Sequence, residues 1–141
     1  MSKAFTKEAD DVPEPKRHRR GVSVPEPNYM TPAGARAARG ELATCTDEER
    51  IRELADHLAT AQIIEPPADH GTVSLGATVT LEDESGRQTK YRIVGALEAD
   101  ARRGFVFWQS PIAAALYGAH VGDVIRLPRG SEAEIVAIDY A

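Results

Sequence analysis

The part of the chain that most constrains the fold is residues 71–141, where alternating side chains and turn signals specify a small sheet. Residues 77–82 alternate apolar and polar side chains, the period-two pattern of a strand with one buried face. Residues 83–86 read Asp-Glu-Ser-Gly, and the glycine is free to adopt the positive φ that a tight turn needs. The chain is therefore predicted to fold back into a second strand over residues 89–94.

A second hairpin and a short helix complete this domain. Residues 124–127 are predicted to form a strand that returns through residues 134–138. Between the hairpins, Ser110 is a good N-cap, Pro111 suits the first helical position, and Gly118 can end the helix. We expect a small α+β domain with an antiparallel sheet and one short helix.

The aromatic side chains near the middle of this domain are expected in its core. Phe105, Phe107 and Trp108 fall on a predicted strand, and Tyr117 follows the helix. Aromatic residues of a small sheet usually pack inside, because each removes a large apolar area from water. An exposed aromatic contact surface is the alternative.

Residues 29–65 are predicted to form a short helical hairpin. Thr31 followed by Pro32 is a helix-start signal, with a hydroxyl acceptor at the N-cap and proline at the first helical position. The second helix is predicted to begin with a capping box in which Thr46 is the N-cap and Glu49 reaches back to it. Because the link between the helices is short, they should pack antiparallel.

The histidines do not predict a metal or catalytic site. His57 lies beside the apolar stripe of the second helix and is expected at a surface or an interface. His70 and His120 fall in predicted loops with no cysteine or carboxylate at metal-ligand spacing. No arrangement of nucleophile and base can be defended either, so we expect no cofactor and no enzymatic activity.

The first part of the chain, residues 1–28, is predicted to be a disordered tail. It is charged and rich in proline, with few apolar side chains whose burial could offset the entropy of ordering. Within it, residues 16–20 form a basic run that could contact nucleic acid weakly or touch an acidic surface of a partner. The alternative is a solvated charge run without a partner.

Composition favours a protein partner in a reducing compartment. The formal net charge of −5 argues against nucleic acid as the primary ligand, because binding to phosphates needs a concentrated basic face. Cys45 is the one cysteine, so no internal disulfide can form. The sequence shows no membrane-spanning run and no signal peptide. We expect a cytoplasmic monomer that does not bind membranes.

Several stretches of the sequence carry a family resemblance. In the C-terminal half they are Gly76-Ala77-Thr78-Val79, Tyr91-Arg92-Ile93-Val94-Gly95, Ser110-Pro111-Ile112-Ala113 and Val121-Gly122-Asp123-Val124. Their order and spacing resemble the C-terminal domain of the bacterial Gre factors, GreA and GreB. Residues 2–6 and 28–34 resemble GreB-type members. The resemblance implies an FK506-binding-protein-like fold that docks on RNA polymerase at the rim of its secondary channel.

The resemblance also implies a polymerase-binding corner at Gln109, Ser110 and Pro111. The family typically has aspartate before the Ser-Pro pair, where this chain has the neutral Gln109. A lost charge-assisted contact would weaken binding by about 1.5 to 3 kcal/mol if the contact is desolvated in the complex. Initiation of the helix is a second role for Ser110 and Pro111, and it is compatible with docking.

The predicted hairpin departs from the family in its length. Full-length Gre factors carry a long coiled coil that presents acidic residues beside the catalytic Mg²⁺ of the polymerase and stimulates cleavage of backtracked RNA. Each helix here has room for about 12 to 15 residues, an arm of roughly 20 Å. The acidic family motif is absent, although Asp47, Glu48 and Glu49 lie at the bend. These residues either assist a polymerase-bound Mg²⁺ or cap the helix and favour its dipole.

The sequence therefore predicts a non-enzymatic Gre-like factor that binds RNA polymerase core and regulates elongation. The short arm predicts that transcript cleavage is not stimulated efficiently and that the chain competes with full-length Gre factors, as Rnk-type relatives with shortened coiled coils are thought to do. Two alternatives remain: an active cleavage factor using the acidic tip, and a free-standing prolyl isomerase with an FK506-binding-protein-like fold.

Overall fold

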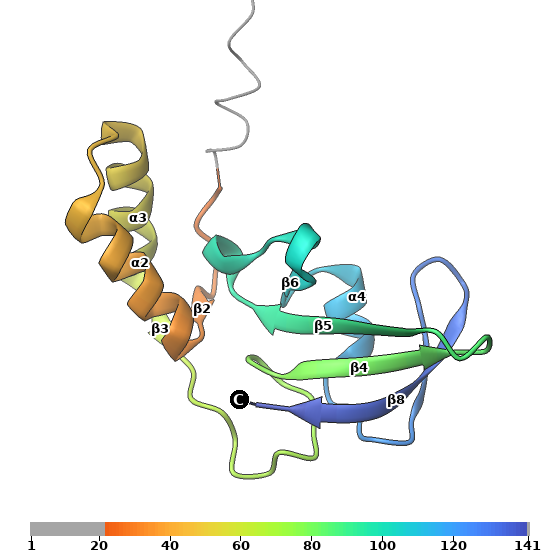
Figure 1. Cartoon of the computed structure of the whole chain (residues 1–141). Helices are drawn as coiled ribbons and strands as arrows, with labels where there is room; N and C mark the ends of the chain where they lie inside the picture. Colours follow the sequence, from red (N-terminus) through yellow and green to blue (C-terminus); the bar gives the residue numbers. More distant parts are fainter. Residues whose placement is uncertain (1–21, 141) are drawn as a thin grey trace, which may run out of the picture.

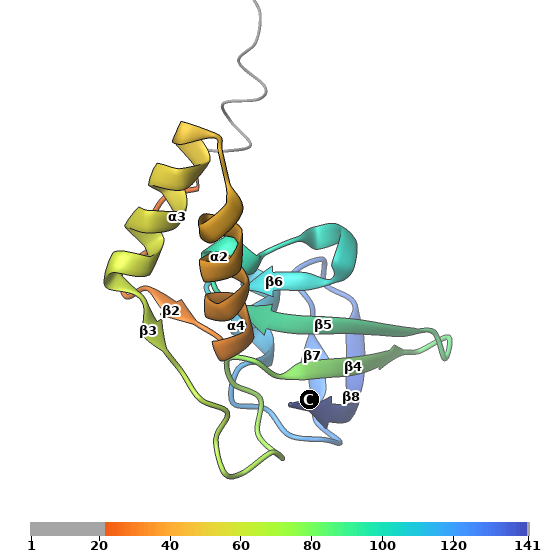
Figure 2. The same ribbon diagram turned by 60° about the vertical axis from the view of Figure 1, so that its left-hand side comes forward.

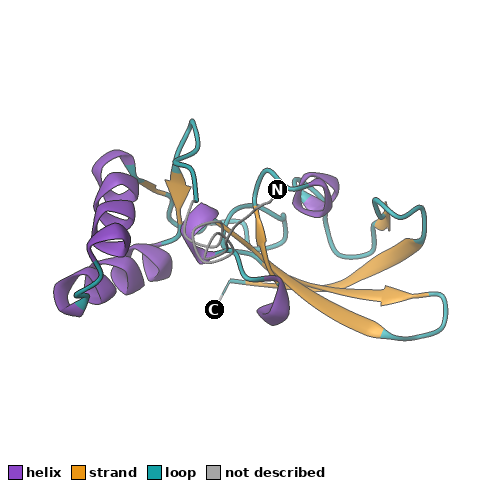
Figure 3. Ribbon diagram, turned by 90° about the horizontal axis from the view of Figure 1, so that it is seen from above, coloured by secondary structure: helices purple, strands orange, loops and turns teal. Residues whose placement is uncertain are grey.

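The computed structural model describes residues 22–140 and consists of a helical hairpin standing beside a curled sheet (Figure 1). The hairpin is formed by α2 (Pro32–Thr44) and α3 (Glu48–Thr60), which lie side by side. Thr31 is the N-cap of α2 and Pro32 is its first residue, as predicted. Seen from above, both helices lie to one side of the sheet (Figure 3).

A small parallel ribbon closes the base of the hairpin. β2 (Tyr29–Met30) precedes α2 and pairs with β3 (Gln62–Ile63), which follows α3. The backbone nitrogen of Gln62 donates to the carbonyl oxygen of Asn28 at 2.8 Å, and that of Ile64 donates to Met30 at 2.9 Å. The sequence did not predict this ribbon, because strands of two residues carry no readable periodicity.

The C-terminal sheet has the strand order β6-β5-β4-β8-β7. Its strands are β4 (Thr78–Asp83), β5 (Gln88–Val94), β6 (Phe105–Phe107), β7 (Val124–Arg126) and β8 (Glu132–Asp139). Both predicted hairpins, β4 with β5 and β7 with β8, are confirmed as antiparallel pairs. The α+β class is therefore confirmed.

One pair in this sheet corrects the expectation of a wholly antiparallel arrangement. β6 pairs with β5 in parallel, so the sheet is mixed. Between them the chain passes through two 3₁₀ turns, η1 (Ala96–Glu98) and η2 (Ala101–Arg103), and β6 begins beside Arg92, in the second half of β5. Gly104 ends this crossover with φ +77, and its Cα lies so close to the sheet that an added Cβ would be 2.7 Å from the carbonyl oxygen of Lys90.

The core lies between the inner face of the sheet and the short helix α4 (Pro111–Leu116). The buried face of β4 is formed by Val79 and Leu81, which confirms the predicted alternation. The alternation is not strict, because Thr80 is buried as well, beside a shift in the β4–β8 register between Thr80 and Leu81. Leu116 brings α4 onto the core and is fully buried.

The aromatic residues are less buried than expected. Phe105, Phe107 and Trp108 are only half-buried, and Tyr117 is 45% exposed, so the prediction of a core position is wrong for Tyr117. The inner face of this small sheet is filled by aliphatic side chains instead. The phenol oxygen of Tyr117 stays near the chain and accepts a hydrogen bond from the backbone nitrogen of Leu75 at 3.3 Å.

Part of the predicted tail lies outside the described residues, including the basic run 16–20. Its last residues, 22–28, have defined contacts with α3. Asn28 is buried, and its Nδ2 donates to the carbonyl oxygen of His57 at 2.7 Å. Within residues 22–140 no helix has both the length and the apolar content needed to cross a bilayer.

Candidate functional site

The corner Gln109-Ser110-Pro111 lies where β6 leads into α4. Ser110 is the N-cap of the helix, because its hydroxyl oxygen accepts a hydrogen bond from the backbone nitrogen of Ala113 at 3.4 Å. The backbone nitrogen of Ser110 donates to the carbonyl oxygen of Phe107 at 2.8 Å. Gln109 and Pro111 are exposed. The predicted helix start is thus confirmed, and two of the three corner side chains face solvent.

Trp108 connects this corner to the base of the hairpin. Its ring centroid lies 4.9 Å from that of Tyr29 in β2 and 5.9 Å from that of Phe107. Its backbone nitrogen donates to the carbonyl oxygen of Val94 at 2.9 Å. The corner is therefore held from both sides, by the end of β5 and by the N-terminal ribbon.

The acidic residues at the far end of the hairpin include the cap of α3. Asp47 is the N-cap, and its Oδ1 accepts a hydrogen bond from the backbone nitrogen of Glu49 at 3.1 Å. The predicted capping box is therefore wrong, because Thr46 lies one residue before the cap. Asp47 offers a charged acceptor to the first-turn amides, whose dipole favours a carboxylate over a neutral hydroxyl.

This placement bears on both interpretations of the acidic tip. One oxygen of Asp47 is engaged with the helix, as the capping interpretation predicts. Glu48 and Glu49 are exposed in the first turn. There the interaction of each carboxylate with the helix dipole stabilises the helix by about 0.3 to 1 kcal/mol. Among residues 22–140 there is no group of three or more His, Cys, Asp or Glu side chains that could hold a metal ion.

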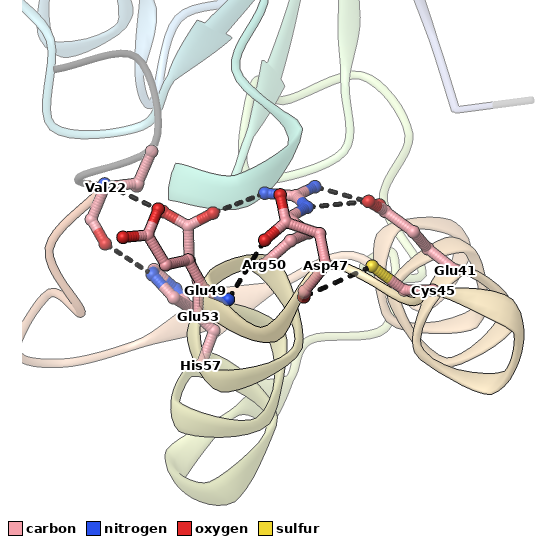
Figure 4. Close-up of polar contacts among 8 residues, drawn as sticks. All are labelled: Val22, Glu41, Cys45, Asp47, Glu49, Arg50, Glu53 and His57. Carbon is pink, nitrogen blue, oxygen red and sulfur yellow. Dashed lines mark hydrogen bonds and ion pairs between the residues drawn. The ribbon is translucent and has the colours of Figure 1, made fainter. Parts of the chain in front are cut away.

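A charged network stabilises the hairpin one turn below its tip (Figure 4). Arg50 donates to both carboxylate oxygens of Glu41 on α2, at 2.6 and 2.9 Å, and to Glu53 on its own helix at 2.5 Å. The hydrogen bond from Arg50 lowers the pKa of the Glu41 carboxyl, and the same contact raises the pKa of the Arg50 guanidinium. Through Arg50, Glu41 and Glu53 hold α2 and α3 together, and Glu53 also binds the residues that precede the hairpin.

His57 is buried, which corrects the expectation of a surface or interface position. Its Nε2 lies 2.9 Å from the carbonyl oxygen of Val22, and the backbone nitrogen of Val22 donates to Glu53 at 2.9 Å (Figure 4). Because a carbonyl oxygen only accepts, Nε2 carries the proton in this contact. Residues before the hairpin cover this face of α3, and no local pattern predicts this contact.

Glu98 joins the hairpin to the C-terminal domain, and sequence reasoning missed it. Its Oε1 accepts from the hydroxyl of Thr31 at 2.6 Å, and its Oε2 accepts from the backbone nitrogens of Thr31 at 3.3 Å and Gly95 at 3.2 Å. The carboxylate therefore binds the N-cap residue of α2 and the turn after β5 together. Thr31 and Glu98 are 67 residues apart, so no local pattern could have paired them.

Two glycines let the hairpin approach this joint. A Cβ at position 34 would overlap the carboxylate of Glu98, and a Cβ at position 95 would overlap the carbonyl oxygen of Tyr29. Gly95 has φ −81, so its backbone conformation suits any residue and the constraint is steric alone. The base of the hairpin and the turn after β5 are thus in direct backbone contact.

A family model described as transcription elongation factor, GreA/GreB, C-term, matches residues 68–140. The chain belongs to the GreA/GreB family. The matched residues contain the whole C-terminal sheet, α4 and the corner around Ser110. The family model joins GreA with GreB and does not distinguish them, so the GreB-like character of the N-terminal residues stays a prediction.

Curated relatives carry the similarity beyond this domain. The transcription elongation factor GreA of Alkalilimnicola ehrlichii is 46% identical over 100 residues, which cover 67% of this chain and 63% of that protein. The transcription elongation factor GreA of Verminephrobacter eiseniae is 38% identical over 135 residues, covering 84% of this chain and 85% of that protein. Against the first of these Gre factors, the match spans under two thirds of the relative's length.

Among solved structures, a transcription elongation factor GreA/GreB from Nitrosomonas europaea is 24% identical to this chain, and the similarity covers 80% of this chain and 98% of that one. The TM-score is 0.47.

Proposed function

We propose that the chain binds RNA polymerase core near its secondary channel and regulates transcription elongation. The proposal rests on the match of residues 68–140 to the Gre C-terminal domain, which contains the exposed corner. The corner comprises Gln109, Ser110 and Pro111, and it presents side chains from a helix start that is anchored by Trp108. The chain acts as a monomer in the compartment that holds the polymerase, without catalysis of its own.

The short hairpin supports regulation without efficient cleavage of the transcript. α2 and α3 have 13 residues each, so at 1.5 Å per residue the arm extends about 20 Å. An arm of this length keeps the carboxylates of its tip near the C-terminal domain that docks. In full-length Gre factors, by contrast, the long coiled coil carries such groups to the catalytic Mg²⁺. A chain that occupies the rim with a short arm would exclude competent factors.

A second candidate function is stimulation of cleavage by the acidic tip. Exposure of Glu48 and Glu49 favours it, because Mg²⁺ prefers carboxylate oxygens that water can reach. The capping role of Asp47 weighs against it.

The docking proposal predicts that Gln109→Asp strengthens binding to core polymerase. A carboxylate at this exposed corner would restore the charge that the family resemblance leads us to expect, and we predict a Kd about tenfold lower. Binding is measured by surface immobilisation of core enzyme and titration of the full chain. Ser131→Asp, in the exposed turn between β7 and β8, adds the same charge away from the corner and should leave Kd unchanged. Equal effects of the two variants, or no binding of the unmodified chain, would contradict docking through this corner.

A further inference from the structure

A groove runs between the hairpin and the C-terminal domain, apart from both the corner and the acidic tip. It has a volume of about 460 Å³ and lies between α2 and the crossover that joins β5 to β6. Figure 2 shows α2 lying beside this crossover. Apolar parts of its wall come from Ala37, Leu54 and Leu97. The groove therefore offers apolar surface and charged side chains together, as binding grooves in proteins commonly do.

The carboxylates that line this groove are already engaged. Glu41 accepts from Arg50, and Glu98 accepts from Thr31. Asp100 accepts a hydrogen bond from the backbone nitrogen of Arg102 at 3.1 Å, because it caps η2. The acidic part of the wall is thus committed to contacts within the chain.

Two arginines in the same groove are not neutralised in this way. The guanidinium of Arg103 lies 4.3 Å from the ring centroid of Phe105, and that of Arg92 lies 5.8 Å from it. Neither arginine has a carboxylate partner within the described part of the chain, and the buried Nε of Arg92 has no hydrogen-bond partner there. The positive charge of this arginine pair is therefore unmatched among the described residues.

We propose that this groove docks an acidic segment of a protein partner, with a carboxylate of that segment received by Arg92 and Arg103. The carboxylate would pair with the two guanidinium groups, and neighbouring apolar side chains of the segment would lie against Ala37 and Leu97. The inference goes beyond the proposed function, since it does not depend on the partner being RNA polymerase or on the corner at Ser110.

The walls of the groove favour a peptide over a nucleic acid. Glu41, Glu98 and Asp100 line it together with the arginines, and the chain has a net charge of −5. A phosphate backbone carries charge at every residue and would meet these carboxylates as well as the arginines. An acidic peptide can place one carboxylate at the arginine pair and apolar groups elsewhere.

The test titrates the full chain with a peptide of alternating glutamate and alanine whose two termini are blocked. Binding is followed through the backbone amide NMR signals of the chain at low salt. The peptide should shift the amides of residues 97–105 in a saturable way. Arg103→Gln, an exposed substitution that leaves the sheet intact, should raise Kd about threefold to fivefold. Arg92→Gln should raise it about tenfold. Arg129→Gln, in the exposed turn between β7 and β8, loses the same charge and should leave Kd unchanged.

Three outcomes would overturn the proposal. One is an equal loss of affinity in Arg129→Gln and Arg103→Gln, which would indicate a response to net charge alone. Another is tighter binding of a single-stranded RNA oligonucleotide than of the peptide at the same residues. The third is binding of the peptide only after the acidic residues of segment 8–11 are replaced by amides, which would make this chain's own N-terminus the occupant.

Discussion

Replacement of Glu98 by alanine is expected to release the hairpin from the C-terminal domain. The variant loses the carboxylate that accepts from Thr31 and Gly95. Hydrogen bonds to a charged group contribute about 1.5 to 3 kcal/mol, so the free energy of unfolding should fall by about 2 to 3 kcal/mol. Cys45 is the single cysteine and lies next to the tip of the hairpin. A spin label there and a second at Arg129→Cys report the orientation of the hairpin relative to the C-terminal domain. The distribution of distances between the two labels should broaden.

Glu134→Ala provides the matched control for this variant. Glu134 lies on an exposed position of β8, and its replacement removes the same side chain from the same domain. Its label distances should equal those of the unmodified chain, and its stability should change by less than about 0.5 kcal/mol. If Glu98→Ala keeps the narrow distance distribution as well, the joint does not fix the hairpin.

Gly95→Ala is expected to be strongly destabilising for a steric reason. The new Cβ would overlap the carbonyl oxygen of Tyr29, a backbone atom that cannot turn away. Forcing an atom into a packed contact typically costs about 1 to 3 kcal/mol, and here β2 must shift with it. Chemical denaturation measures the loss, and the ring contact between Tyr29 and Trp108 should weaken too, which is visible in the emission of the single tryptophan.

Gly40→Ala separates this steric effect from the general cost or gain of an added methyl group. Gly40 lies in α2 with nothing within 4 Å of the position that a Cβ would take. Alanine there should stabilise the helix by about 1 kcal/mol. Equal stability changes at positions 40 and 95 would mean that the close approach to Tyr29 does not constrain the fold.

Local chemistry made part of the fold predictable. The starts of α2 and α4 follow from Thr31-Pro32 and Ser110-Pro111, because a cap and a proline act within a single turn. The sequence predicts the start of α3 one residue too early, since Thr46 and Asp47 are both good caps and no local signal decides which one the first turn selects. The parallel pairing of β6 was missed because a crossover of two 3₁₀ turns lacks the helix that usually marks one.

The contacts of the candidate site also divide into those that local sequence predicts and those that it does not. The corner could be placed from sequence because its residues are consecutive and one of them caps a helix. The contacts of Glu98 with Thr31 and of His57 with Val22 could not, because each joins residues brought together only by tertiary packing. The polymerase-binding role of the corner remains a prediction.

Cleavage of RNA in stalled elongation complexes tests the central claim most directly. The claim is that an arm of about 20 Å leaves the tip carboxylates too far from the catalytic Mg²⁺ to act. Labelled RNA is followed at saturating chain, with and without a competent Gre factor. We predict no shortening of the RNA by the chain alone, and slower shortening when it is added to the competent factor. Mg²⁺-dependent shortening by the chain alone, abolished by Glu48→Gln with Glu49→Gln, would contradict the account.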